Sequence, residues 1–247
     1  MLDFYKKEEK MNKKIQAFTL AEVLITLGII GVVAAMTIPS LIQSYREKAI
    51  VTRVKKFYSV FSQAYLMAVQ ENGTIDNWGL EDSVLVEDDE GNQVHDDKSL
   101  DQYDKFFNIM SKYLQKAGYE KLHNSKSPDG FENTGFILPD GTQIVGLWLL
   151  PSQCSNQKYN AVCGDFYIKV DNKPYYKSDG KTLNSNVFAF IINPNRIFPY
   201  GTDNTTFENY CLNGKNYSRC TGWVIINENM DYLHCKGLSF NGKTKCK

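Results

Sequence analysis

The sequence lacks the short motifs that mark the common catalytic centres. Its 247 residues contain no nucleophile elbow, no phosphate-binding loop and no dinucleotide-binding fingerprint. Only three histidines are present, His95, His123 and His234, and their wide separation gives no metal-ligand or triad spacing. We therefore expect no enzymatic activity and no cofactor.

An excess of charge of either sign is also absent, because 28 Lys and Arg balance 28 Asp and Glu. A general nucleic-acid-binding protein usually carries a clear basic surplus. The balance therefore argues against a nucleic-acid partner.

One long apolar run stands out near the N-terminus. It extends over residues 18–38 with a single carboxylate, Glu22, near its start, and the lysine-rich segment 1–16 precedes it. About 20 apolar residues suffice for a helix to cross a bilayer. Positive charge before the run keeps that side in the cytoplasm, so residues after Pro39 should face outward. A secretory signal peptide would have a shorter core, no acid and a small-residue cleavage site, which Ala34-Ala35-Met36 imitates.

The residues Ala17-Phe18-Thr19-Leu20-Ala21-Glu22 resemble the cleavage and methylation signature of type IV prepilins and type II secretion pseudopilins. The resemblance implies that a prepilin peptidase cuts between Ala17 and Phe18, removes the leader 1–17 and methylates the new amino group of Phe18. It also implies that Glu22 is the acid used in assembly and that Pro39 kinks the helix. Ala17 departs from the family, in which Gly usually precedes the cut.

Glu22 calls for a partner, because a carboxylate at bilayer depth is costly alone and less costly beside a cation. After cleavage the ammonium group of Phe18 would lie four residues away along the helix. The pair would form within one subunit, or between an incoming subunit and one already assembled, where it would set the register. The alternative is a polar residue merely tolerated near the membrane interface.

Helical periodicity continues beyond Pro39, with apolar residues recurring at helical spacing as far as Ala68. Asn72-Gly73 supplies the end of the helix. We therefore expect a long helix over 18–72, with a transmembrane half at 18–38 and an amphipathic half that packs beneath a globular head at 73–247.

The head is predicted to be mixed in structure. A second helix is expected at 99–117, followed by strands at 135–138, 142–149, 166–170 and 187–192, and Asp140-Gly141 is typical of a tight hairpin turn. This order predicts an α+β, pilin-like fold in which the long helix packs on an antiparallel sheet. A further strand is expected at 223–226, inside the C-terminal tail 194–247.

No cysteine precedes residue 154, and all six lie in the C-terminal part of the chain. An even number behind an export signal indicates disulfides, whereas a zinc site is disfavoured because no Cys-x-x-Cys occurs. Six cysteines allow fifteen pairings. Sequential neighbours are our expectation: Cys154–Cys163, Cys211–Cys220 and Cys235–Cys246.

The strongly acidic segment 81–104 is expected to be a solvated loop, since like charges repel and stay open. Calcium binding is the alternative, although no spacing matches a helix-loop-helix calcium loop. Some pseudopilins bind calcium near the turn that precedes the last strands, and the resemblance makes Asp171 and Asp179 the residues to test; a plain hairpin turn is the alternative.

Taken together, these features predict a filament subunit of a type IV pilus-like or type II secretion pseudopilus system, held in the bacterial inner membrane by a single pass with its head in the periplasm. Its partners would be prepilin peptidase and other pilin subunits, contacted through helix packing. About 230 residues after cleavage favour a minor or specialised subunit. The alternative is a monomeric, membrane-tethered periplasmic binding domain that uses the signal only for export. Pilus-mediated DNA uptake has little support from the neutral charge.

Overall fold

The computed structural model describes residues 19–87, 89, 91, 93–114, 120–126, 132–155, 161–171, 178 and 183–246. For strand residues 93, 94, 120–126 and 132–136 it describes the backbone alone. The chain divides into two compact units, of which unit 1 ends at Tyr45 and unit 2 comprises Arg46–Lys247.

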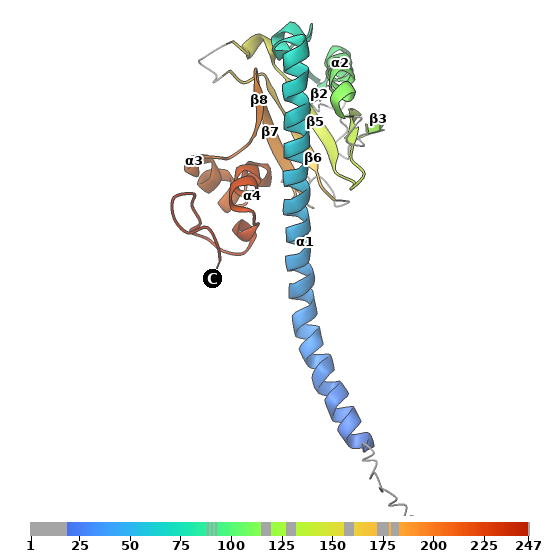
Figure 1. Ribbon diagram of the computed structural model, residues 1–247, viewed down its shortest axis with the longest axis vertical. Coiled ribbons are helices and arrows are strands. Elements are labelled where there is room, and N and C mark those ends of the chain that lie inside the picture. Colours follow the sequence, from blue (N-terminus) through green and yellow to red (C-terminus); the bar gives the residue numbers. More distant parts are fainter. Residues whose placement is uncertain are drawn as a thin grey trace, which may run out of the picture. The chain divides into compact units, whose positions relative to one another are not determined.

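Helix α1, Leu20–Asn72, is the longest element and runs from unit 1 into unit 2, which confirms the predicted long N-terminal helix (Figure 1). It ends where Gly73 adopts a φ of +78°, a left-handed conformation that glycine reaches at little cost. Pro39 lies within the helix and cannot donate a backbone hydrogen bond. The helix continues without interruption through this position, and the kink remains a prediction.

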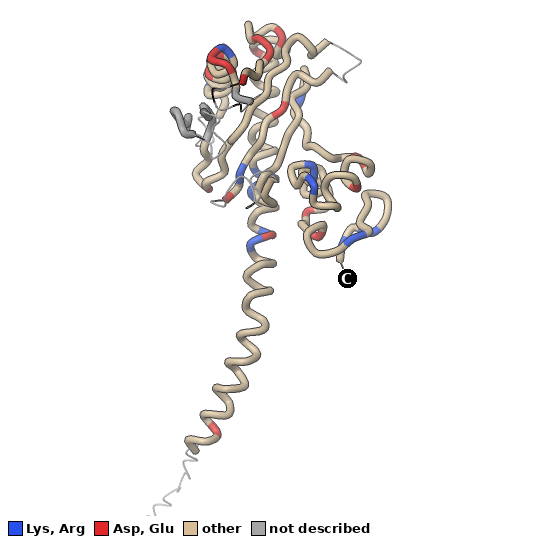
Figure 2. Tube along the Cα trace, turned by 180° about the vertical axis from the view of Figure 1, so that it is seen from behind, with Lys and Arg blue, Asp and Glu red and all other residues tan. Residues whose placement is uncertain are grey.

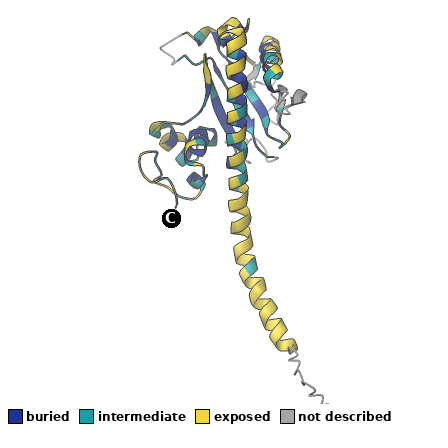
Figure 3. Cartoon of the chain, viewed as in Figure 1, coloured by how far each residue is buried: buried dark blue, intermediate teal, exposed yellow. Residues whose placement is uncertain are grey.

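The part of α1 in unit 1 exposes almost all of its apolar side chains (Figure 3). Among the described residues, α1 is the one helix long and apolar enough to cross a membrane, by length and composition. No residue of its most apolar window is buried within the chain. The exposed set, each at least 50 % accessible, comprises Leu20, Leu24, Ile25, Leu27, Ile29, Ile30, Val32, Val33, Met36, Ile38, Leu41, Ile42 and Tyr45.

Unit 2 is built on a six-stranded antiparallel sheet in which sequence neighbours are also spatial neighbours, in the order β3-β4-β5-β6-β7-β8. The predicted α+β fold with an antiparallel sheet is thus confirmed. The strands are β3 Glu120–Lys126, β4 Glu132–Ile137, β5 Gln143–Leu149, β6 Gly164–Lys169, β7 Val187–Asn193 and β8 Arg196–Pro199.

The expected hairpin joins β4 to β5. The backbone N–H of Leu138 donates to the carbonyl of Thr142 at 2.9 Å, and Asp140 Oδ1 accepts from the N–H of Thr142 at 3.0 Å. Gly141 has a φ of +83°, the conformation for which Asp-Gly is suited. The outer strands β3 and β8 were not predicted, because Glu120–Lys126 is mostly polar and Arg196–Pro199 has only Ile197 and Phe198 before a proline.

Helix α2, Asp97–Leu114, lies beside the sheet and matches most of the helix predicted at 99–117, whose last three residues lie outside the described part of the chain. It begins two residues early because Asp96 caps it. Oδ1 of Asp96 accepts from the N–H of Ser99 at 2.8 Å and from its hydroxyl at 2.6 Å.

The expectation of an open acidic loop was wrong in part. Strand β1, Leu85–Glu87, pairs antiparallel with β2, Gln93–His95, in a separate two-stranded sheet. Leu85-Val86 and Val94-His95 are favourable strand residues, and their pairing outweighs the repulsion between the acids around them.

The core of unit 2 lies between one face of the sheet and the buried side of α1 (Figure 1). Phe57 and Phe61 on α1 stack at 5.1 Å and meet Phe166 of β6 at 5.9 and 4.9 Å. Three polar contacts fix α1 along the sheet: Arg53 Nη1 donates to the carbonyl of Val170 at 2.7 Å, Tyr65 OH to that of Asn193 at 2.9 Å, and Tyr58 OH to that of Ile197 at 3.3 Å.

Short helical segments form most of the tail after β8. They are α3 Asn204–Thr206, η5 Phe207–Leu212, η6 Tyr217–Cys220, α4 Thr221–Asn227 and η7 Asp231–Leu233. The strand predicted at 223–226 was wrong, since these residues lie within α4. Trp223 is fully buried and stacks on Phe207 with ring centroids 4.3 Å apart. This packing overrides the strand preference of the β-branched run that follows Trp223.

Three disulfides lie in unit 2. They join Cys154 to Cys163, Cys211 to Cys220 and Cys235 to Cys246, so each links sequential neighbours. The last two lie in the tail: Cys211–Cys220 precedes α4 in the sequence, and Cys235–Cys246 follows it.

Candidate functional site

The start of α1 is held by a reciprocal pair of side chains, Thr19 and Glu22. Glu22 Oε2 accepts from the N–H and the hydroxyl of Thr19, both at 2.9 Å, and Thr19 Oγ1 accepts from the N–H of Glu22 at 3.3 Å. This is a capping box, in which two otherwise unpaired backbone donors of the first turn are satisfied. Ala17 and Phe18, where cleavage is expected, lie outside the described residues.

Glu22 is the single charged residue between Leu20 and Ile38. The two threonines within this segment bond to the helix backbone: Thr26 donates to the carbonyl of Val23 at 2.9 Å, and Thr37 donates to that of Val33 at 2.9 Å. Such bonds make a hydroxyl tolerable in an apolar medium. Such bonds do not remove the charge of an ionised carboxylate, so Glu22 is the costly group of this segment.

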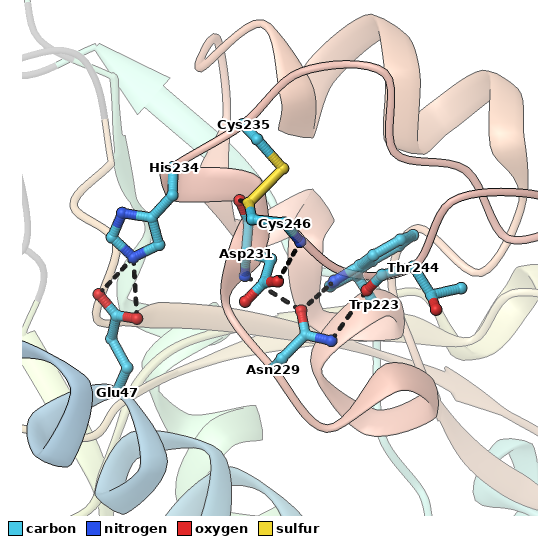
Figure 4. The surroundings of a disulfide bond; sticks show 8 residues. All are labelled: Glu47, Trp223, Asn229, Asp231, His234, Cys235, Thr244 and Cys246. Carbon is cyan, nitrogen blue, oxygen red and sulfur yellow. Dashed lines mark hydrogen bonds and ion pairs between the residues drawn. A yellow bond between two sulfur atoms is a disulfide. The ribbon is translucent and has the colours of Figure 1, made fainter.

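The tail contacts α1 where the helix enters unit 2. Nε2 of His234 lies 2.8 and 2.9 Å from the two carboxylate oxygens of Glu47 (Figure 4). An ion pair also joins Lys55 to Glu228, the residue that directly follows α4. The tail is therefore fastened to α1 at two points eight residues apart.

Hydrogen bonds hold the end of the tail in place behind this contact (Figure 4). Oδ1 of Asn229 accepts from Trp223 Nε1 at 2.9 Å, and its Nδ2 donates to the carbonyl of Thr244 at 3.1 Å. The N–H of Cys246 donates to Asp231 Oδ2 at 2.5 Å. The disulfide Cys235–Cys246 closes the same loop, so the segment bearing His234 is fixed from both sides.

The calcium candidates do not come together in the described part of the structure. Asp171 Oδ1 accepts from Nδ2 of Asn186 at 2.6 Å, and Asp179 lies outside the described residues. No group of three or more His, Cys, Asp or Glu among the described residues is placed to hold a metal ion.

The three histidines lie apart. The hydroxyl of Tyr103 lies 2.9 Å from Nδ1 of His95, whose pKa is lowered because burial disfavours the charged ring. His123 is on β3, and His234 contacts Glu47 as described. Each described histidine side chain is thus engaged in a local structural contact.

Comparison with known proteins assigns most of the chain. Residues 40–221 match the model of a family described as a family of unknown function, DUF6613. The chain belongs to this family. Residues 12–38 of this DUF6613 protein match the prokaryotic N-terminal methylation motif. No curated protein and no solved structure matches it significantly.

The match over residues 12–38 confirms the prepilin signature of type IV pilins and pseudopilins in this DUF6613 protein. It indicates a pilin-like subunit, a structural protein rather than an enzyme, that is processed by prepilin peptidase and anchored to a membrane. The match to the signature ends at residue 38 and the match to the family begins at residue 40, so Pro39 lies between them.

Two features of the site were not expected from the sequence. The Thr19–Glu22 capping box was detectable, because Thr-x-x-Glu before an apolar run is its known pattern. The contact between Glu47 and His234 had no such signal, since 187 residues separate its partners.

Proposed function

We propose that this chain is a minor or specialised subunit of a type IV pilus-like or type II secretion pseudopilus filament. Prepilin peptidase cuts between Ala17 and Phe18, and Phe18 becomes the methylated N-terminus. The leader 1–17 stays in the cytoplasm, 18–38 crosses the inner membrane once, and the head faces the periplasm. The prepilin signature is the observation that supports this most strongly.

The exposed apolar side of α1 supports assembly through this helix. Between Leu20 and Ile38 large apolar side chains are not buried by any described residue, and lipid or neighbouring helices would have to cover them. Glu22 projects from the same segment. In a helix bundle it would pair with the ammonium group of Phe18, of its own or of a neighbouring subunit, because each charge is costly alone in an apolar medium.

The mass of the mature N-terminus tests the processing step. A peptide that begins with methylated Phe18 is expected. An intact Met1, or a cut after Ala35, would contradict the proposal, because the first means no processing and the second an ordinary signal peptide.

A Glu22→Ala variant tests assembly. The chain should accumulate in the membrane in normal amount and fail to enter filaments. Thr26→Ala is the matched control, since it removes a polar group of the same helix that bonds only to its own backbone. Normal incorporation of Glu22→Ala would overturn the assembly role. Processing without any filament in wild-type cells would instead favour a membrane-tethered monomer.

A further inference from the structure

Charge is distributed unevenly along unit 2. Over residues 46–56, where α1 enters the unit, the sequence has five Lys or Arg and one Glu. From residue 57 to residue 97 it has no Lys or Arg and ten Asp or Glu. The formal net charge of zero therefore conceals two regions of opposite sign.

One region, called the basic surface here, combines the start of α1 in unit 2 with the tail. The two parts lie at the same end of the unit, because His234 contacts Glu47 and Glu228 pairs with Lys55. None of its members forms an ion pair with a described residue, and all are exposed. They are Arg46, Lys48, Lys236, Lys243 and Lys245.

The other region, called the acidic surface, surrounds the C-terminal end of α1. It consists of Glu71, Asp76, Glu81 and Asp82. The last three line an open hollow of about 450 Å³ together with Leu80, Pro151, Ser152 and Ser155. The hollow thus combines apolar groups with carboxylates, which suits the methylene chain and the charged end of a lysine or arginine.

No described residue neutralises the negative charge of these four carboxylates. Glu71 accepts a hydrogen bond from Tyr113 OH at 2.7 Å, and Asp82 accepts from the N–H of Ser152 at 3.0 Å, both from uncharged donors. Asp76 and Glu81 form no ion pair with a described residue. The adjacent helix α2 does not neutralise them, because its three lysines are matched by three aspartates.

The two surfaces lie at opposite ends of the α1 segment in unit 2. Arg46 and Glu71 are 25 residues apart, which corresponds to about 38 Å of helix. Figure 2 shows blue segments on α1 and the tail near the C-terminus, and red segments gathered at the other end of the unit, where α2 adds both colours. Ion pairing within one chain cannot join groups this far apart.

We propose that the acidic surface of one copy binds the basic surface of a second copy, displaced along α1 by about the length of this segment; the inference rests on the proposed filament function. Copies that assemble through the same helix point the same way, and a displacement along that helix brings the acidic end of one head to the basic end of the next. Such a contact uses a different surface on each partner, and repeated contacts of this kind build open filaments. Opposite charges also select the parallel, staggered arrangement over a side-by-side one, in which like surfaces would meet.

Zero-length crosslinking tests the contact directly. Cells that assemble the full-length chain are shifted from ¹⁵N to ¹⁴N medium, so that labelled and unlabelled copies are present together, and a carbodiimide joins neighbouring carboxylates and amines. Mixed-isotope peptides should link Asp76 or Glu81 to Lys48, Lys236, Lys243 or Lys245. Crosslinks from the acidic surface only within one chain, or only to another protein, would overturn the proposal.

Charge reversal gives the second test. Asp76→Lys with Glu81→Lys brings the acidic surface from four negative charges to no net charge, and Lys48→Glu with Lys243→Glu brings the basic surface from five positive charges to a net charge of one. Each double variant alone should lower the filament-bound fraction at least tenfold. Co-expression of the two should restore it in part, because the unchanged acidic surface of one variant can meet the unchanged basic surface of the other. The matched controls are Asp101→Lys with Glu208→Lys, and Lys105→Glu with Lys112→Glu. Each control changes the net charge by the same amount as the corresponding test variant, but at exposed positions outside both surfaces, and should assemble normally.

The outcomes separate the two proposals. If wild-type chain is processed but enters no filament, the proposed function fails. If wild-type chain assembles and the reversal variants assemble equally well, the filament function stands and the charge contact fails. Loss of assembly in the controls as well would assign the effect to net charge and likewise overturn the contact.

Discussion

The imidazole of His234 in the tail and the carboxylate of Glu47 on α1 are in hydrogen-bond contact at 2.8 Å, although 187 residues separate them in sequence. The contact lies where α1 enters unit 2, and the loop that carries His234 is closed by Cys235–Cys246. The tail is thereby fastened to the helix that we propose assembles the filament.

A double-mutant cycle measures this contact. Glu47→Ala and His234→Ala should each lower the free energy of unfolding, with a coupling of about 0.2–1 kcal/mol, because the pair is partly exposed. Unfolding of the full chain in detergent can be followed by tryptophan fluorescence. The cycle on Lys56 and Asp140, whose charged atoms lie 3.9 Å apart, is the control and should give a smaller coupling. Zero coupling between Glu47 and His234 would mean that the tail is held by its other contacts alone.

Gly201 is expected to be far more sensitive to substitution than Gly237. Both adopt left-handed φ values, +72° and +71°. A Cβ at Gly201 would lie 1.8 Å from the carbonyl oxygen of Arg219, whereas one at Gly237 would meet nothing within 4 Å. Gly237→Ala should therefore cost about 1–2 kcal/mol, the strain of the left-handed conformation. Gly201→Ala should cost roughly 3 kcal/mol or more, since backbone must also move. Equal thermal destabilisation of the two variants would contradict the close approach.

Asp165 and Asp203 should give opposite pH dependences. Burial raises the pKa of Asp165 above 3.8, whereas hydrogen bonds from the backbone N–H of Thr206 lower the pKa of Asp203 below 3.8. The contribution of Asp165 to the free energy of unfolding is at its maximum below pH 3.8 and is lost as the pH rises through the folded-state pKa of this residue. That of Asp203 is present above pH 3.8 and is lost as the pH falls through its folded-state pKa.

Thermal unfolding between pH 3 and 7 checks this difference. Wild type should lose stability relative to Asp165→Asn as the pH rises and gain stability relative to Asp203→Asn. Asn retains an acceptor for the hydroxyl of Tyr200 at position 165 and for the helix cap at position 203. Slopes of the same sign in both comparisons would contradict either the burial of Asp165 or the capping role of Asp203.

The capping and charge roles of Glu22 can be separated. Glu22→Gln keeps an oxygen that can accept from Thr19 but removes the charge, whereas Thr19→Ala removes the hydroxyl and keeps the charge. If charge pairing drives assembly, Glu22→Gln should block filament incorporation and Thr19→Ala should leave it near normal. Sheared filament fractions probed by immunoblot provide the measurement. The reverse pattern would reduce Glu22 to a helix cap.

Peptide mapping without reduction should recover three linked pairs, each of sequential neighbours, and no free thiol. Replacing Cys235 and Cys246 together by Ser opens the loop behind His234 and should lower the free energy of unfolding by about 2–3 kcal/mol, the usual effect of a short closed loop. Any other pairing in extracted protein would contradict the arrangement of the tail.

The sequence alone determined the features that depend on neighbouring residues. An apolar run of membrane length, the prepilin signature, the helical periodicity through Ala68 and the Asp140-Gly141 turn each arise from local geometry and short-range preference. These fixed the long helix, the hairpin and the α+β order. The Thr19–Glu22 capping box was equally local, although we did not anticipate it.

Only the tertiary structure decided the features that depend on distant contacts. Trp223 lies in a helix because Phe207 offers it a stacking partner, although the residues after it favour a strand. The acidic segment pairs as β1 and β2, and His234 reaches Glu47, because the folded chain brings these residues together. The separation of charge to two ends of unit 2 has the same origin: sequence order gives the sign of each region, but only the fold places the basic tail beside the basic start of α1.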